Sequence, residues 1–84
     1  MKPIVLTHHA EAKIAERGLQ GDWVEQTARE PDWREPEPDD PQAERRFRAV
    51  ATRDGRVLRV VCVETKTTIR IITAMFDRGA RRKP

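Results

Sequence analysis

The sequence has few of the residues that build the common chemical sites. It contains one cysteine and no tyrosine, and it has none of the cysteine and histidine spacings that are typical of zinc sites. Its four glycines are isolated along the chain, so no glycine-rich loop is present to hold nucleotide phosphates. We therefore expect no metal ion, no cofactor and no nucleotide hydrolysis of the usual kinds.

Long hydrophobic runs are also missing. No stretch approaches the roughly 20 apolar residues of a membrane span, and the apolar stretch near the N-terminus is far shorter than the core of a signal peptide. Cys62 lies within an apolar run and has no second cysteine to pair with, which indicates a buried thiol in a reducing compartment. We expect a cytoplasmic protein without membrane contact, folded as a single domain over residues 1–84.

Charged residues are abundant and unevenly distributed. Residues 1–29 have a net charge of zero, residues 30–44 carry −6 and residues 45–84 carry +9. The middle segment is rich in proline and predicts an extended acidic loop. The basic part, which ends in a tail over residues 78–84, favours nucleic acid, phosphate or an acidic protein as a ligand. The alternative is that these charges only keep a small domain in solution.

The first expected helix begins after Thr7, whose hydroxyl group can accept a hydrogen bond from the first turn. It ends at Gly18, since a residue in the left-handed conformation commonly closes a helix. At 100° per residue, the side chains of His9, Lys13 and Arg17 share one arc of this helix.

A second helix is expected to start with Asp22 as its N-cap and to stop before Pro31. From residue 45 onward the hydrophobic period changes to two, and Asp54 and Gly55 mark a tight hairpin turn. The pattern predicts the order β-α-α-β-β-β, an α+β fold with two helices packed on a small antiparallel sheet.

Histidine, lysine and arginine are the residue types that a metal-free ribonuclease needs. Cleavage of RNA by its own 2′-OH group requires a base, an acid, and cations that stabilise the phosphorane. His9 can serve as the base or the acid, and Arg17 and Arg59 can hold phosphate oxygens. Each residue also has a plainer interpretation. His9 suits a capping or surface position, Arg17 an ion pair on a solvated face, and Thr73 the filling of a strand rather than a phosphate contact.

Other basic residues are candidates for RNA binding. A guanidinium buried without a partner is costly, so we expect Arg59 and Arg70 on the open face of the sheet. If the acidic loop screens this face, neutralising Asp39 and Asp40 raises the affinity for RNA. The candidate RNA-binding residues are Lys13, Arg46, Arg48, Arg70, Arg81 and Arg82.

Four segments together resemble a known family. They are THHA…K…ERG at residues 7–18, then EPDW, DGRVLRVV and IRIITAMF, and they resemble the bacterial domain-of-unknown-function family 4258. That family is similar in expected fold to the RelE/ParE group of toxins, which includes ribonucleases neutralised by an antitoxin. The resemblance implies a RelE/ParE-like fold and the catalytic candidates His9, Arg17, Arg59 and Thr73.

The leading functional hypothesis is therefore a toxin-like, metal-independent endoribonuclease of a toxin–antitoxin system. Its partners would be RNA, free or on the ribosome, and an antitoxin protein. The alternative is a non-catalytic module that binds RNA or an acidic protein through its basic sheet face and tail.

Overall fold

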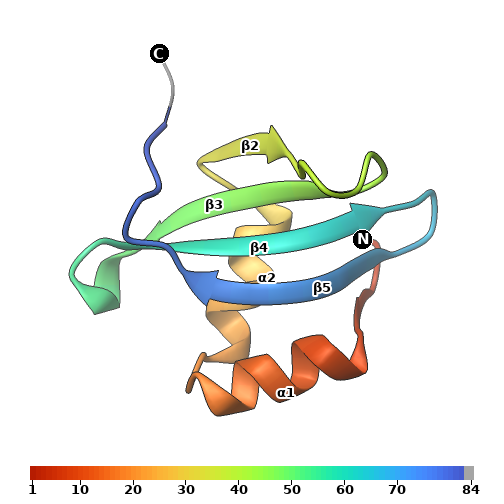
Figure 1. Ribbon diagram of the computed structural model, residues 1–84. Helices are drawn as coiled ribbons and strands as arrows, with labels where there is room; N and C mark the ends of the chain where they lie inside the picture. Colours follow the sequence, from red (N-terminus) through yellow and green to blue (C-terminus); the bar gives the residue numbers. More distant parts are fainter. Residues whose placement is uncertain (83–84) are drawn as a thin grey trace.

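The computed structural model describes residues 1–82, which form one five-stranded sheet and two helices (Figure 1). A short 3-10 helix precedes the turn between two of the strands. In chain order the elements are β1 (Ile4–Leu6), α1 (His8–Glu16), α2 (Gly21–Arg29), β2 (Trp33–Pro36), β3 (Glu44–Val50), the 3-10 helix (Ala51–Arg53), β4 (Arg56–Glu64) and β5 (Ile69–Phe76).

The predicted α+β fold is confirmed, with two additions. The strand order across the sheet is β1-β5-β4-β3-β2, and β1 pairs with β5 in parallel, so the sheet is mixed rather than antiparallel. A strand that the sequence did not indicate, β2, lies within the acidic segment and pairs with β3 in antiparallel orientation. The acidic segment is thus partly a sheet edge, with the loop over residues 37–43 between β2 and β3.

The helix α2 covers one face of the sheet and α1 runs along β5 at the edge of the sheet, and the core lies between the helices and the sheet (Figure 1). Along β4 the side chains of Leu58, Val60 and Cys62 face the helices and are fully buried, since successive residues of a strand point to opposite faces. The opposite face, called here the open face, carries residues that alternate with these: Phe47, Arg59, Val61, Thr73 and Met75. The expected buried thiol at Cys62 is confirmed.

Local signals set the boundaries of α1. The hydroxyl group of Thr7 accepts a hydrogen bond from the amide of Ala10 at 3.0 Å, which confirms the predicted N-cap. Gly18 has a φ of +63°, the left-handed conformation expected after a helix. The predicted cap of α2 is wrong, because this helix starts one residue before Asp22 and its N-cap, Gln20, makes no side-chain hydrogen bond. Neither helix is long and apolar enough to cross a membrane.

Arg46, a candidate for RNA binding, has a structural position instead. Its side chain is 2% exposed on the helix side of β3. One nitrogen donates to the carbonyl oxygen of Ala28, near the end of α2, at 2.6 Å, and the others contact Glu44 and Glu64. Because a buried guanidinium needs such partners, its donors are occupied within the protein and are not available to a ligand.

Candidate functional site

Three arginines from three elements line one cleft at an end of the sheet. Arg17 follows the last turn of α1, Arg53 belongs to the 3-10 helix, and Arg56 begins β4. The cleft has a volume of about 420 Å³. It lies where the end of α1, the turn before β4 and the end of β5 meet, on the left in Figure 1. We call it the arginine cleft; its lining residues are Arg17, Gly18, Leu19, Arg53, Arg56, Met75 and Phe76.

Aromatic rings and one backbone carbonyl hold these arginines in place. The guanidinium carbon of Arg56 lies 4.3 Å from the ring centre of Phe76, and that of Arg53 lies 5.8 Å from the rings of both Trp23 and Phe76. Arg17 donates from Nη1 to the carbonyl oxygen of Ala74 at 2.8 Å. Stacking on a ring orients a guanidinium without neutralising it, so the cleft keeps its positive charge.

Carboxylates are missing from the arginine cleft. None of its seven lining residues is acidic, and within residues 1–82 none of the three arginines forms an ion pair. The turn brings two of them together, because Asp54 and Gly55 both have a positive φ, of 56° and 73°, and reverse the chain tightly. Sequence reasoning missed Arg53 and Arg56. The signal that could have found them is a pair of arginines flanking the Asp-Gly turn.

The helix α1 continues from the cleft along β5. The arginine cleft together with Lys13 and His9 of this helix is called here the basic margin. The start of α1 is fixed by Thr7, whose amide donates to the carbonyl oxygen of Ile71 and whose hydroxyl donates to that of Ile72. Its end is fixed to Ala74 by Arg17. The helix therefore runs along the edge of β5, and Thr73 lies between these two attachment points.

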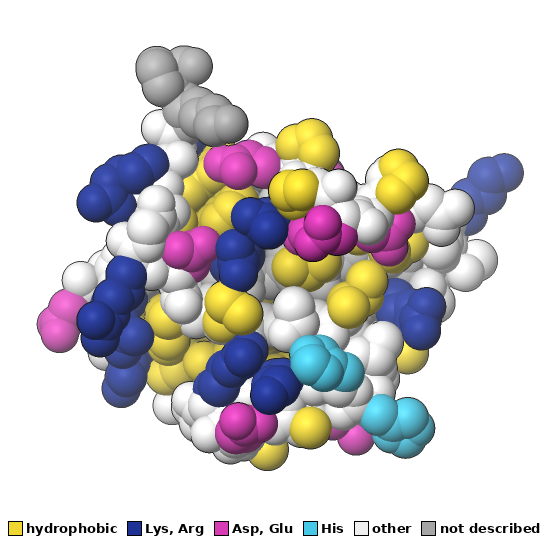
Figure 2. Space-filling model, viewed as in Figure 1, with side chains coloured by type: hydrophobic (Ala, Val, Ile, Leu, Met, Phe, Trp, Pro, Cys, Tyr) yellow, Lys and Arg dark blue, Asp and Glu magenta, His cyan; other side chains and the backbone are white. Residues whose placement is uncertain are grey.

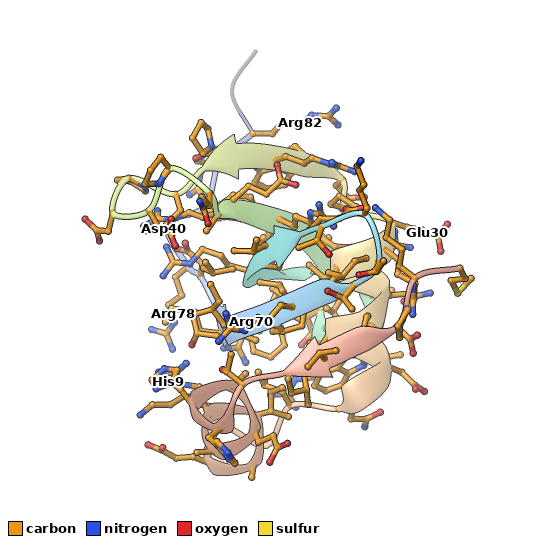
Figure 3. All side chains as sticks on the ribbon, turned by 90° about the vertical axis from the view of Figure 1, so that its right-hand side faces the viewer. His9, Glu30, Asp40, Arg70, Arg78 and Arg82 are labelled. Atoms are coloured by element: carbon orange, nitrogen blue, oxygen red, sulfur yellow. The ribbon has the colours of Figure 1, made fainter. Side chains whose placement is uncertain are left out.

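His9 is exposed in the first turn of α1 and projects on the open-face side of the molecule, opposite Glu30 (Figure 3). His9 and Arg17 are eight positions apart in the sequence, and this spacing corresponds to about 12 Å along the helix axis. Between them Lys13 forms an ion pair with Glu16 at 3.2 Å. Figure 2 shows the histidines and the neighbouring basic side chains along the lower margin of the open face, with a further basic group at its left edge.

Arg59 lies on the open face, as its charge led us to expect, and is paired there. Its Nη1 lies 3.2 Å from Oδ2 of Asp77, and its Nη2 lies 2.8 Å from the sulfur of Met75. Its Nε is buried and has no hydrogen-bond partner among the described residues. Thr73 lies diagonally across from it on the same face, where Cβ atoms are about 7 Å apart.

The four catalytic candidates therefore share one region without sharing one pocket. Residues 73–75 of β5 connect three of the candidates: Thr73 is one of them, Arg17 donates to Ala74, and Arg59 contacts Met75. Met75 also lines the arginine cleft. His9 lies near the other end of α1 and does not line that cleft. The region offers an imidazole and several guanidinium groups along one margin, spaced for an extended ligand rather than for a single small anion.

A second arginine of the open face is also neutralised. Arg45 donates to both carboxylate oxygens of Glu37, at 2.8 and 3.4 Å. These hydrogen bonds hold the pKa of Glu37 below its ordinary value, and the charge of Arg59 lowers it further. The hydrogen bonds to Glu37 and, to a smaller extent, the charge of Asp77 raise the pKa of Arg45. The two ion pairs, Arg45–Glu37 and Arg59–Asp77, thus form one group of four interacting charges, called here the open-face quartet.

The remaining candidates for RNA binding are spread over the surface. Arg48 is half-buried on the helix side and donates to the carbonyl oxygen of Glu30. Arg70 is exposed and shares the open face with Val63 by register. In the basic tail, Arg81 donates to nearby backbone carbonyls and Arg82 is exposed beside the end of β2. The last two residues of the tail, 83–84, lie outside the described residues.

Metal-binding side chains do not gather in the described part of the chain. No three histidine, cysteine, aspartate or glutamate side chains of residues 1–82 are placed to hold a metal ion.

Comparison with protein families shows which family the chain belongs to. The model of a domain of unknown function, DUF4258, matches residues 6–76. The chain belongs to this family, as its motifs led us to expect. The match includes α1 with His9 and Arg17, and extends to the last residue of β5. No curated protein and no solved structure matches the chain.

Proposed function

We propose that the protein binds single-stranded RNA through its phosphate groups, and that the arginine cleft makes the main contact. The observation that supports this function is the presence of Arg17, Arg53 and Arg56 in one cleft without a lining carboxylate. Guanidinium groups match phosphate oxygens in a planar, two-point geometry. The resemblance of the family to ribonuclease toxins favours RNA over DNA, because phosphate contacts by themselves do not distinguish the two.

The remainder of the basic margin extends this contact. From the cleft, α1 continues along β5 for about 12 Å to His9, which gives a strand of RNA a path lined by Lys13 and His9 on its way out of the cleft. The open-face quartet lies beside this path, and its arginines are already paired. The arginines of the cleft form no ion pair with the described residues and stay available for phosphate.

Fluorescence anisotropy with a labelled 20-nucleotide RNA tests the proposal. Arg53→Ala removes one phosphate contact, which for single-stranded nucleic acid is worth a factor of roughly five in affinity at 0.1 M salt. The matched control is Lys66→Ala, which removes the same charge from the exposed loop between β4 and β5, at the other end of the sheet. Equal effects of the two variants would contradict the proposal, and equal binding of DNA of the same sequence would contradict its assignment to RNA.

A second candidate function, a toxin-like endoribonuclease that needs no metal, is favoured by the position of His9. The imidazole is exposed at the margin along which the RNA would run. As a base it would take the proton of a 2′-OH group, whose oxygen attacks the adjacent phosphorus while the 5′-oxygen leaves with a proton from an acid. Arg17, two helical turns away, would hold a neighbouring phosphate. Arg59 would stabilise the phosphorane after leaving Asp77, and Thr73 would contact a phosphate oxygen.

Cleavage assays in the presence of a chelator test this second candidate. The expected products are a 2′,3′-cyclic phosphate and a 5′-hydroxyl end. His9→Ala should abolish cleavage while RNA binding remains, and His8→Ala, which removes the neighbouring exposed imidazole, should leave cleavage intact. A toxin should also arrest growth when expressed and be neutralised by a partner protein from an adjacent reading frame. If the wild-type protein cleaves neither free RNA nor RNA on ribosomes, the endoribonuclease candidate is contradicted and RNA binding is the one function that stands.

A further inference from the structure

The arginine cleft holds more positive charge than one phosphodiester can neutralise. Three guanidinium groups line it, and no acid does. A phosphodiester within an RNA chain carries one negative charge and two free oxygens. A phosphate monoester at neutral pH carries a charge of about −1.5 to −2 and three strong acceptor oxygens. We propose that the cleft prefers a phosphate monoester at an end of an RNA chain, an inference that rests on the proposed RNA binding.

The hydrogen-bond donors of the cleft fit this group. Each guanidinium has five N–H donors in its own plane, and Arg53 and Arg56, whose guanidinium carbons lie over the ring of Phe76, donate no side-chain hydrogen bond to the described residues. Arg17 uses Nη1 for the carbonyl oxygen of Ala74 and keeps its other donors. A monoester offers the three arginines three free oxygens and a larger charge, whereas a diester offers two free oxygens and a single charge.

The arginines are also held in place before a ligand arrives. The guanidinium carbons of Arg53 and Arg56 both lie over the ring of Phe76, at 5.8 and 4.3 Å from its centre. Holding flexible side chains in their binding positions reduces the entropy lost on binding. Ion pairs would hold the side chains too, but they would place competing carboxylates where the phosphate must lie. The use of aromatic rings thus preserves the whole charge of the cleft for a ligand.

The shape of the cleft suits a chain end. Its volume of about 420 Å³ exceeds that of a phosphate group, and Leu19, Met75 and Phe76 give it an apolar wall. A terminal nucleoside can therefore follow its phosphate into the cleft and pack against this wall.

Four RNAs of one sequence separate the two kinds of phosphate: a 5′-phosphorylated, a 3′-phosphorylated, a doubly hydroxylated and a circular form, each with an internal label. We expect a phosphorylated end to raise the affinity roughly tenfold over the hydroxylated form, the worth of one added charge-assisted hydrogen bond. The end that binds more tightly identifies the source of the monoester. Circular RNA should bind as weakly as the hydroxylated form.

Variants assign the preference to the cleft. Arg53→Ala should reduce the ratio of affinities between phosphorylated and hydroxylated RNA to near one, while Lys66→Ala leaves this ratio unchanged. Arg53 is exposed, and an unchanged thermal midpoint verifies that its variant is folded. Equal binding of all four RNAs by the wild-type protein would overturn the preference for chain ends and leave the proposed RNA binding intact. Absence of binding to any of the four would overturn both.

Discussion

Release of the two arginines of the open-face quartet should strengthen RNA binding. Glu37→Gln and Asp77→Asn keep the size of each side chain and remove its charge, so Arg45 and Arg59 become available to phosphate. For single strands, each added phosphate contact steepens the slope of log affinity against log salt by about 0.7. This corresponds to a factor of roughly five per contact at 0.1 M salt, and to about twofold at 0.3 M. The double variant should therefore bind RNA about 25-fold more tightly at 0.1 M salt.

The assay is anisotropy across a salt series, and the matched control is Asp39→Asn. Asp39 belongs to the same acidic loop as Glu37 and is exposed, but it forms no ion pair with a described arginine. The sequence suggested that neutralising Asp39 and Asp40 would unmask the basic face. The structure assigns the contact with a basic residue to Glu37 instead. If Asp39→Asn strengthened binding as much as Glu37→Gln, general repulsion rather than the release of Arg45 would explain the effect.

Three further outcomes concern stability and reactivity. Thr7→Ala should lower the free energy of unfolding by about 1 kcal/mol, measured by denaturant titration, because α1 loses its cap. Hydrogen bonds from Lys2 and then Arg46 lower the pKa of Glu64 to about 2. The contribution of Glu64 to stability is therefore complete above about pH 4.5 and is lost as the pH falls through 2. Between pH 5 and pH 2, the thermal midpoint of Glu64→Gln should fall less than that of the wild type. Burial raises the pKa of the Cys62 thiol to about 11, so iodoacetamide should label it at pH 8 only after unfolding.

Local signals in the sequence were sufficient for both boundaries of α1, the end of α2 and the hairpin. Thr7, Gly18 and the Asp54–Gly55 turn each act through their own backbone or the adjacent turn, and the structure uses them as expected. Asp22 failed as a cap because the helix starts earlier, with Gln20 at the cap position. A cap signal shifted by two residues is within the range over which helix ends vary.

The additional strand could not be read from local signals, because β2 depends on a distant partner. Its sequence, WREP, contains a proline and lies among acidic residues and further prolines, which predicts a loop. In the fold it is held by the register with β3 and by the ring of Trp33, stacked on Phe47 at a centroid distance of 4.7 Å. Such pairing stabilises a strand that has little intrinsic preference for the conformation.

Arginines with similar sequence surroundings have very different environments. Arg48 and Arg59 both lie in strands between apolar residues, yet one is half-buried on the helix side, where it donates to the carbonyl oxygen of Glu30, and the other is paired with Asp77 on the open face. The alternation of a strand gives two faces but does not say which face the helices cover. Arg53 and Arg56 acquire their importance only because the turn places them beside the ends of α1 and β5. That proximity is a property of the tertiary fold.

The salt dependence of RNA binding tests the central claim most directly. The wild-type protein and Arg53→Ala/Arg56→Ala are titrated with the same RNA between 0.05 and 0.3 M salt, a range of roughly sixfold over which each phosphate contact changes the affinity measurably. If the arginine cleft holds phosphate, the magnitude of the slope of log affinity against log salt decreases by about 0.7 or more in the double variant, since at least one phosphate contact is lost. An unchanged slope would show that RNA is bound elsewhere, and would contradict the account.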